Sequence, residues 1–161
     1  MAYRGVTDDI PACVALKKPR RIPIFALSEE FDVKLYGKYT SEEVVQSADK
    51  LVDVWGAAVR EFNYDWAYLQ VDDCIEFEGL GVGCVGEGNI VRATHDYLPA
   101  TEETLKSLKL PDPTRAGRMP IKLEALRRLT AESAIPCASW AAVPRLILRQ
   151  AYCSDWKHRW C

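Results

Sequence analysis

The sequence lacks two features that would assign it quickly to a class of protein. Basic residues are not in excess, because 21 Lys and Arg stand against 23 Asp and Glu, for a net charge of -2. We therefore expect no nucleic-acid partner, since a polycationic tail is absent. No apolar run approaches the roughly 18–20 residues that cross a bilayer, and residues 1–5 lack the apolar core of a signal peptide. We expect a cytoplasmic protein without a membrane partner.

Cysteine pairs with the spacing of a metal site are also lacking. The six cysteines form no Cys-x-x-Cys pair, and a secreted disulfide scaffold is normally shorter and richer in cysteine. Reduced, mostly buried thiols fit this pattern best. Cys153, His158 and Cys161 have the chemistry of zinc ligands, but a fourth ligand at a sensible spacing is missing. We therefore expect no metal and no cofactor in this chain.

Apolar runs alternate with helical stripes in the first half of the chain. Residues 22–27 form a continuous apolar run, typical of a strand that is buried on both faces. A capping box at Thr40 and Glu43 predicts a helix that continues to Asn63. Residues 66–71 predict the next strand. A strand, a helix and a strand in this order form a βαβ unit.

The second half of the chain continues this pattern without a domain boundary. A short helix is predicted from Thr101 to about Leu108, and a longer one over residues 119–133. Residues 135–140 predict a third strand. The longer helix is expected to present one apolar face, made of Leu123, Leu126 and Leu129.

A cluster of glycines contains a possible nucleotide-binding motif. Gly81, Gly83 and Gly86 match the spacing Gly-x-Gly-x-x-Gly. A dinucleotide-binding loop lies between a strand and a helix, whereas residues 89–93 predict another strand here. We therefore expect a glycine-lined turn or hairpin in this region.

Three segments resemble the uroporphyrinogen decarboxylase superfamily, which also contains cobamide-dependent methyltransferases that use zinc to activate a thiol. The first resembles the family's entry into its first barrel strand, and the second its acidic segment after the second strand. The third is the most specific, because the motif and the helix that follows it both recur. In order, the segments are KPRRIPIF at 18–25, DDCIEFEGLG at 72–81, and LPDP at 110–113 with GRMP at 117–120 and LEA at 123–125.

The resemblance implies an α/β fold, the (β/α)8 or TIM barrel. Residues 1–140 would form its N-terminal portion, with about three of the eight strands. Asp72 matches the family's catalytic aspartate and ends the second predicted strand. Active sites of such barrels lie at the C-terminal ends of strands. The resemblance assigns to this carboxylate the stabilisation of positive charge on a protonated pyrrole ring.

A structural role competes with this assignment. Asp72 or Asp73 would also cap a following helix. We favour the catalytic role for Asp72 and the structural role for Asp73, Glu76 and Glu78.

One segment departs from the decarboxylase pattern. Residues 28–32, SEEFD, stand where the decarboxylase carries an Arg-Gln-Ala-Gly-Arg motif for substrate carboxylates. This acidic stretch would repel an octa-acid porphyrinogen. The methyltransferase branch, or an uncharacterised one, is therefore the closer likeness. A full-length methyltransferase relative would use zinc and a corrinoid, with its zinc ligands late in the chain.

The family pattern stops at residue 140. Residues 141–161 hold four basic residues, one acid, two tryptophans and two cysteines. An apolar stripe predicts a basic amphipathic helix in this tail. Read one nucleotide earlier, its codons allow a family-like Gly-Pro-Phe segment, so we expect an out-of-frame tail.

Two functions stay open. The first is a truncated enzyme of this family that is inactive as a fragment, because the barrel needs roughly 250 residues. Its parent would decarboxylate a porphyrinogen or transfer a methyl group linked to a corrinoid, so its substrate is a small molecule. A complementing chain would supply the missing strands. The alternative is a non-catalytic binding module whose basic, aromatic tail docks a partner or a membrane.

Overall fold

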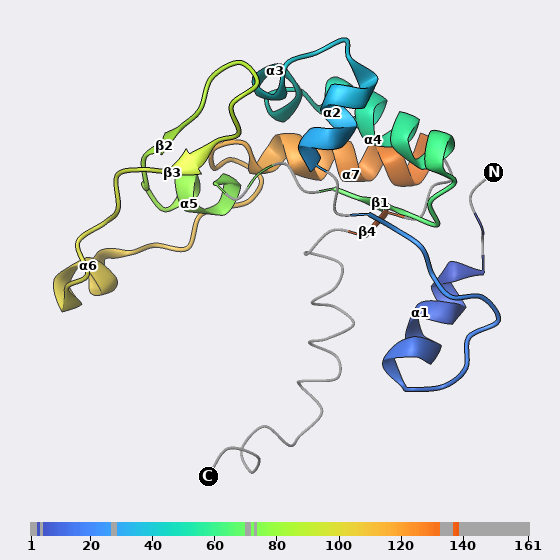
Figure 1. Cartoon of the computed structure of the whole chain (residues 1–161). Coiled ribbons are helices and arrows are strands. Elements are labelled where there is room, and N and C mark those ends of the chain that lie inside the picture. Colours follow the sequence, from blue (N-terminus) through green and yellow to red (C-terminus); the bar gives the residue numbers. More distant parts are fainter. Residues whose placement is uncertain are drawn as a thin grey trace.

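A computed structural model describes residues 3, 5–26, 29–69, 72, 74–132 and 137–138 (Figure 1). The helices are α1 (Val6–Val14), α2 (Glu29–Tyr36), α3 (Ser41–Val45), α4 (Ala48–Phe62), α5 (Ile75–Gly79), α6 (Glu102–Ser107) and α7 (Met119–Glu132). The strands are β1 (Ala67–Tyr68), β2 (Cys84–Val85), β3 (Ala93–Thr94) and β4 (Cys137–Ala138). In this part of the chain, every helix is too short or too polar to cross a membrane.

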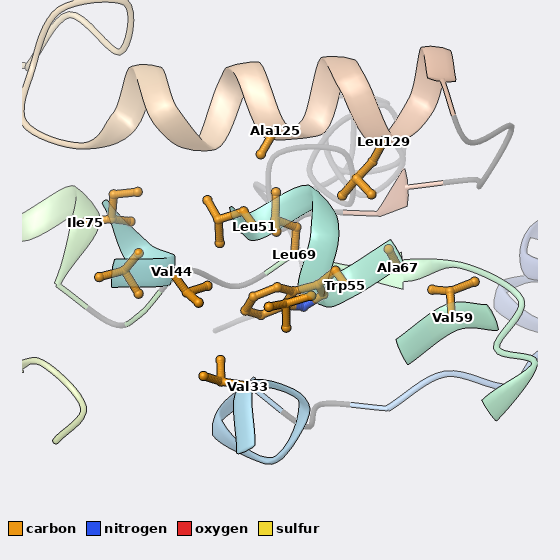
Figure 2. Packing of buried hydrophobic residues seen from close by; sticks show 12 residues of the cluster. Val33, Val44, Leu51, Trp55, Val59, Ala67, Leu69, Ile75, Ala125 and Leu129 are labelled. Carbon is orange, nitrogen blue, oxygen red and sulfur yellow. The ribbon is translucent and has the colours of Figure 1, made fainter. Parts of the chain in front are cut away.

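Helix α4 lies at the centre of the hydrophobic core. It contacts α2, α3, α7 and β1, and its buried residues include Leu51 and Trp55. Figure 2 shows Ala125 and Leu129 pointing from α7 toward Leu51 and Leu69. The Trp55 indole Nε1 donates a hydrogen bond of 2.7 Å to the carbonyl of Tyr68. This bond fixes α4 against the strand that precedes Asp72.

Strands β1 and β4 form a parallel pair, with Ala67 opposite Cys137. The connection between them includes α7, which packs against α4. The strands predicted over residues 66–71 and 135–140 are therefore confirmed over two residues each. Residues 70, 71, 135, 136, 139 and 140 lie outside the described residues.

The strand predicted over residues 22–27 is wrong for the residues that the structure describes. Residues 22–26 form no strand, and Ile22 is 76% exposed although burial on both faces was expected. The Ile24 amide donates to Asp65 Oδ2 over 2.8 Å, and its carbonyl accepts from the Asp65 amide over 2.9 Å. A side chain thus takes the amide that a strand partner would bind, and Pro23 has no amide hydrogen to donate.

The single helix predicted from Thr40 is divided into α3 and α4. The capping box of Thr40 and Glu43 is confirmed, and so is the left-handed cap at Asn63, with φ of 53°. The break occurs because the Ser47 side chain accepts a hydrogen bond from the Lys50 amide and starts a new helix.

The glycine-lined turn or hairpin predicted in this stretch is present as the antiparallel pair of β2 and β3, but the strand predicted over residues 89–93 is found at residue 93 alone, because β3 is Ala93–Thr94. The stretch follows helix α5 instead of a strand, so it lacks the setting of a dinucleotide-binding loop. Gly86 has φ of +149°, and a Cβ there would lie 2.7 Å from the Arg92 Cα. Only glycine fits this close approach between the two arms of the hairpin.

The helices predicted after Thr101 and over residues 119–133 are confirmed as α6 and α7. The predicted apolar face of α7 is wrong at Leu123, which is 41% exposed, whereas Leu129 and Ala125 are fully buried. Residues six apart on a helix are rotated by about 120° from each other. Leu123 therefore turns away from the face that Leu129 presents to the core, and Ala125, four residues before Leu129, takes its place.

Shortening Leu129 to alanine is expected to lower the free energy of unfolding by about 2–5 kcal/mol, because the cavity would lie inside the core. Leu123→Ala on the same helix is the matched control, with an expected loss of less than about 1 kcal/mol at a half-exposed site. Urea unfolding followed by circular dichroism measures both. Equal losses for the two variants would contradict this orientation of α7.

Candidate functional site

Asp72 lies after β1, with its side chain only 1% exposed. Its Oδ1 accepts a hydrogen bond of 2.9 Å from the Cys74 amide, directly before α5. The Cys74 side chain itself caps nothing at this helix start. Asp72 therefore forms a turn before α5 and is not the N-cap of that helix, which is Cys74, and the same contact fixes one carboxylate oxygen in place.

Arg118 is the main partner of Asp72. Its Nη1 donates to Asp72 Oδ2 over 2.6 Å, and its Nη2 donates to Asp72 Oδ1 over 3.0 Å. This paired geometry is the strong form of a guanidinium–carboxylate contact. The Arg118 side chain is 11% exposed and directly precedes α7, 46 residues further along the chain. The contact therefore ties the segment that follows β1 to the start of α7.

Glu78 extends this pair into a network of four charges. Its Oε2 accepts from Arg118 Nε over 2.8 Å. Its Oε1 accepts from Arg92 Nε over 3.1 Å and from Arg92 Nη2 over 2.6 Å. Two carboxylates and two guanidinium groups thus balance in charge. We name these four residues, Asp72, Glu78, Arg92 and Arg118, the ion network.

The ion network shifts the pKa of two of its members. Burial of the Glu78 carboxyl opposes its ionisation, but Arg118 and Arg92 outweigh burial and lower its pKa. Burial likewise opposes the charge of Arg118, while Asp72 and Glu78 outweigh it and raise the pKa of the guanidinium. Glu78 and Arg118 are therefore both charged at neutral pH.

The Asp72 carboxylate retains limited capacity for a ligand. A carboxylate offers about four acceptor positions, and three donors among the described residues bind Asp72. Among the described residues, none donates to the second position on Oδ2, which would suit an N–H or O–H group. The negative charge is compensated by Arg118, so its effect on a nearby cation is weaker than that of an isolated carboxylate.

A small pocket adjoins Asp72. Its apolar walls are formed by Val33, Val45, Trp55, Ile90 and Val91, and its polar lining by Glu30, Ser41, Glu42, Asp72 and Arg92. Glu30 comes from the acidic segment 28–32, so one of the carboxylates expected to repel a polyacid lines this pocket, whereas Asp32 lines a different one.

The other acidic residues singled out in the sequence differ in their surroundings. Glu78 is not a helix cap, because it stands at the centre of the ion network. Glu76 is exposed and forms an ion pair of 3.2 Å with Lys122. Asp73 lies outside the described residues. Arg118 and Arg92 were missed, although Arg118 belongs to the segment 117–120 that resembles the family most specifically.

The cysteines in the described residues are poor candidates for metal ligands. Burial, together with the adjacent Cys84 thiol, raises the pKa of Cys74 to about 12, which disfavours the thiolate that zinc requires. Cys13 is exposed, contrary to the expected burial. In this part of the chain, no group of three His, Cys, Asp or Glu side chains is placed to hold a metal. Cys153, His158 and Cys161 lie outside it.

A comparison with protein families agrees with the resemblance seen in the sequence. The model of the family described as uroporphyrinogen decarboxylase (URO-D) matches residues 7–152. The match takes in the whole ion network and runs past residue 140, so the division of the chain at that residue stays a prediction. No curated protein and no solved structure matches the chain.

Proposed function

The chain belongs to the uroporphyrinogen decarboxylase family, and from this premise we propose that Asp72 serves an active site for decarboxylase-like chemistry on a small molecule. The family implies a TIM barrel, and such barrels place their active sites at the C-terminal ends of strands. Asp72 follows β1 and lies buried beside a pocket. This placement is the observation that carries the proposal.

The proposed role of Asp72 is electrostatic. Loss of CO₂ from a protonated ring needs a partner for the positive charge, and a fixed carboxylate supplies one without reorganising. The free acceptor position on Oδ2 suits a ring N–H group. Arg118 would hold the carboxylate in one orientation, while its positive charge would offset part of the negative potential of Asp72.

The acidic lining of the pocket limits the charge that a substrate could carry. Glu30 and Glu42 stand beside Asp72, so we propose a substrate with fewer carboxylates than an octa-acid porphyrinogen. The same observation favours a second candidate reaction, methyl transfer linked to a corrinoid. Because the described residues do not fit a zinc site, no step through zinc is assigned to them.

The described residues would supply only part of the barrel. Their parallel sheet has two strands, β1 and β4, whereas the closed barrel has eight. We propose that residues 1–140 form its N-terminal portion, and that residues 1–161 alone do not turn over substrate. A complementing chain with the remaining strands would restore the site.

Two assays test this function on the full chain, purified alone and after co-expression with the product of the adjacent downstream reading frame. One follows uroporphyrinogen decarboxylation, and the other follows methyl transfer from methylcobalamin to a thiol. We expect turnover in one assay, and only in the co-expressed sample. A soluble, folded complex without either activity would overturn the proposal. A monodisperse single chain that instead binds vesicles would favour a binding module.

A further inference from the structure

The β2–β3 hairpin, residues 84–94, covers the pocket beside Asp72. Ile90, Val91 and Arg92 form one side of this pocket, and residues of α2, α3 and α4 form the rest. Asp72 as a whole residue is 4% exposed. With the hairpin in this position, the Asp72 side chain is only 1% exposed, so the carboxylate is shielded from solvent.

The tip of the hairpin is fastened to the start of α3, beside which it lies in Figure 1. The Gly88 amide donates to Glu42 Oε2 over 2.8 Å, and the Glu42 amide donates to the Gly88 carbonyl over 2.8 Å. The Ser41 amide donates to Asn89 Oδ1 over 3.2 Å. First-turn amides have no partner within their own helix. The hairpin tip therefore caps α3.

The base of the hairpin is held by an ion pair and by the Cys84 thiol beside Cys74. Arg92 binds Glu78 at its base, and no residue from 84 to 94 is buried or belongs to the core cluster. Segments held by few buried apolar contacts open at low cost. Before the hairpin, Gly81 has φ of +90° and nothing within 4 Å of the position of a Cβ. This glycine is free to act as a hinge.

We propose that the hairpin is a lid over Asp72, latched to α3 by Glu42 and Asn89, which swings away to admit a ligand. The chemical class of the ligand rests on the proposed function, whereas the opening of the hairpin does not. Arg92 moves with the lid, so opening also separates Arg92 from Glu78 and leaves Glu78 paired with Arg118.

Labelling of Cys74 by N-ethylmaleimide measures the opening. Cys74 is fully buried against Cys84 of β2, so the reagent reaches it when the hairpin lifts. The test uses the full chain carrying Glu42→Ala and Asn89→Ala together, with peptide mass spectrometry to read Cys74 alone. Loss of the latch hydrogen bonds is expected to raise the labelling rate about tenfold.

Glu43→Ala is the matched control. Glu43 lies beside Glu42 in α3, but its carboxylate binds Thr40 and Lys50 instead of the hairpin. We expect its Cys74 labelling rate to stay within about twofold of the original chain. Hydrogen exchange over residues 51–59 reports on the core and should be unchanged in every variant.

Three results would overturn the lid. The first is a Cys74 labelling rate that is unchanged in the double variant. The second is an equal rise of the Cys74 labelling rate in Glu43→Ala. The third is hydrogen exchange over residues 51–59 that becomes faster together with the labelling of Cys74. These measurements need no substrate. A failed activity assay would therefore contradict the proposed function alone. The lid would still be tested by the labelling of Cys74.

Discussion

Arg118→Met is expected to lower the free energy of unfolding by about 3–5 kcal/mol at neutral pH. The Arg118 and Asp72 side chains are 11% and 1% exposed, so the substitution leaves a buried carboxylate without its cation. Glu78 would keep Arg92 only. An unpaired buried charge costs far more than the loss of an exposed ion pair. Urea unfolding at constant ionic strength measures the difference.

Arg127→Met on the same helix is the control for the Arg118 substitution. The Arg127 side chain is 65% exposed and pairs with Glu124 three residues earlier, so its loss should cost less than about 1 kcal/mol. If Arg118→Met does not fold, adding Asp72→Asn should restore folding, because Glu78 keeps Arg92 and no charge of the ion network then lacks a partner. Equal costs for Arg118→Met and Arg127→Met would contradict the buried network.

The pH dependence of the free energy of unfolding is a second test of Arg118→Met. Arg118 and Arg92 lower the pKa of Glu78 in the folded state below the unfolded value of 4.5. Its contribution is therefore complete above pH 4.5 and is lost as the pH falls through the folded pKa. Acid should weaken the original chain more than Arg118→Met. The difference in free energy of unfolding between the two proteins should narrow at low pH. A difference that widens at low pH would contradict the pairing of Glu78 with Arg118.

Features set by neighbouring residues could be predicted from the sequence. The capping box of Thr40 and Glu43, the left-handed Asn63 and the hairpin after Gly81 follow from contacts within a few residues. Ser47 shows the limit of such rules. An apolar stripe runs on through it, but its side chain caps α4 and divides the helix.

Features set by residues far apart in the chain could not be predicted in this way. Asp72 was found from a family resemblance, whereas its partner Arg118 is 46 residues away. The segment 22–26 fails as a strand because Asp65, 41 residues from Ile24, takes its amide. Neither pairing leaves a periodic trace in the sequence, since each is decided by how the elements pack.

Asp72→Asn is expected to reduce turnover at least about 100-fold, the usual cost of removing an electrostatic partner of the transition state. Asparagine keeps the shape of the side chain and the oxygen that binds the Cys74 amide, but it carries no charge. Asp112→Asn is the matched control. Asp112 is exposed, and its Oδ1 accepts from the Thr114 amide over 2.9 Å in a similar turn, away from the ion network.

The most direct test of the account is the turnover rate of Asp72→Asn and Asp112→Asn in the co-expressed complex, in whichever of the two assays is active. Both variants are compared at a temperature where circular dichroism shows each to be folded. We predict that Asp112→Asn keeps the original rate while Asp72→Asn loses at least about 100-fold. Equal rates for the two variants would contradict the assignment of Asp72 to the active site.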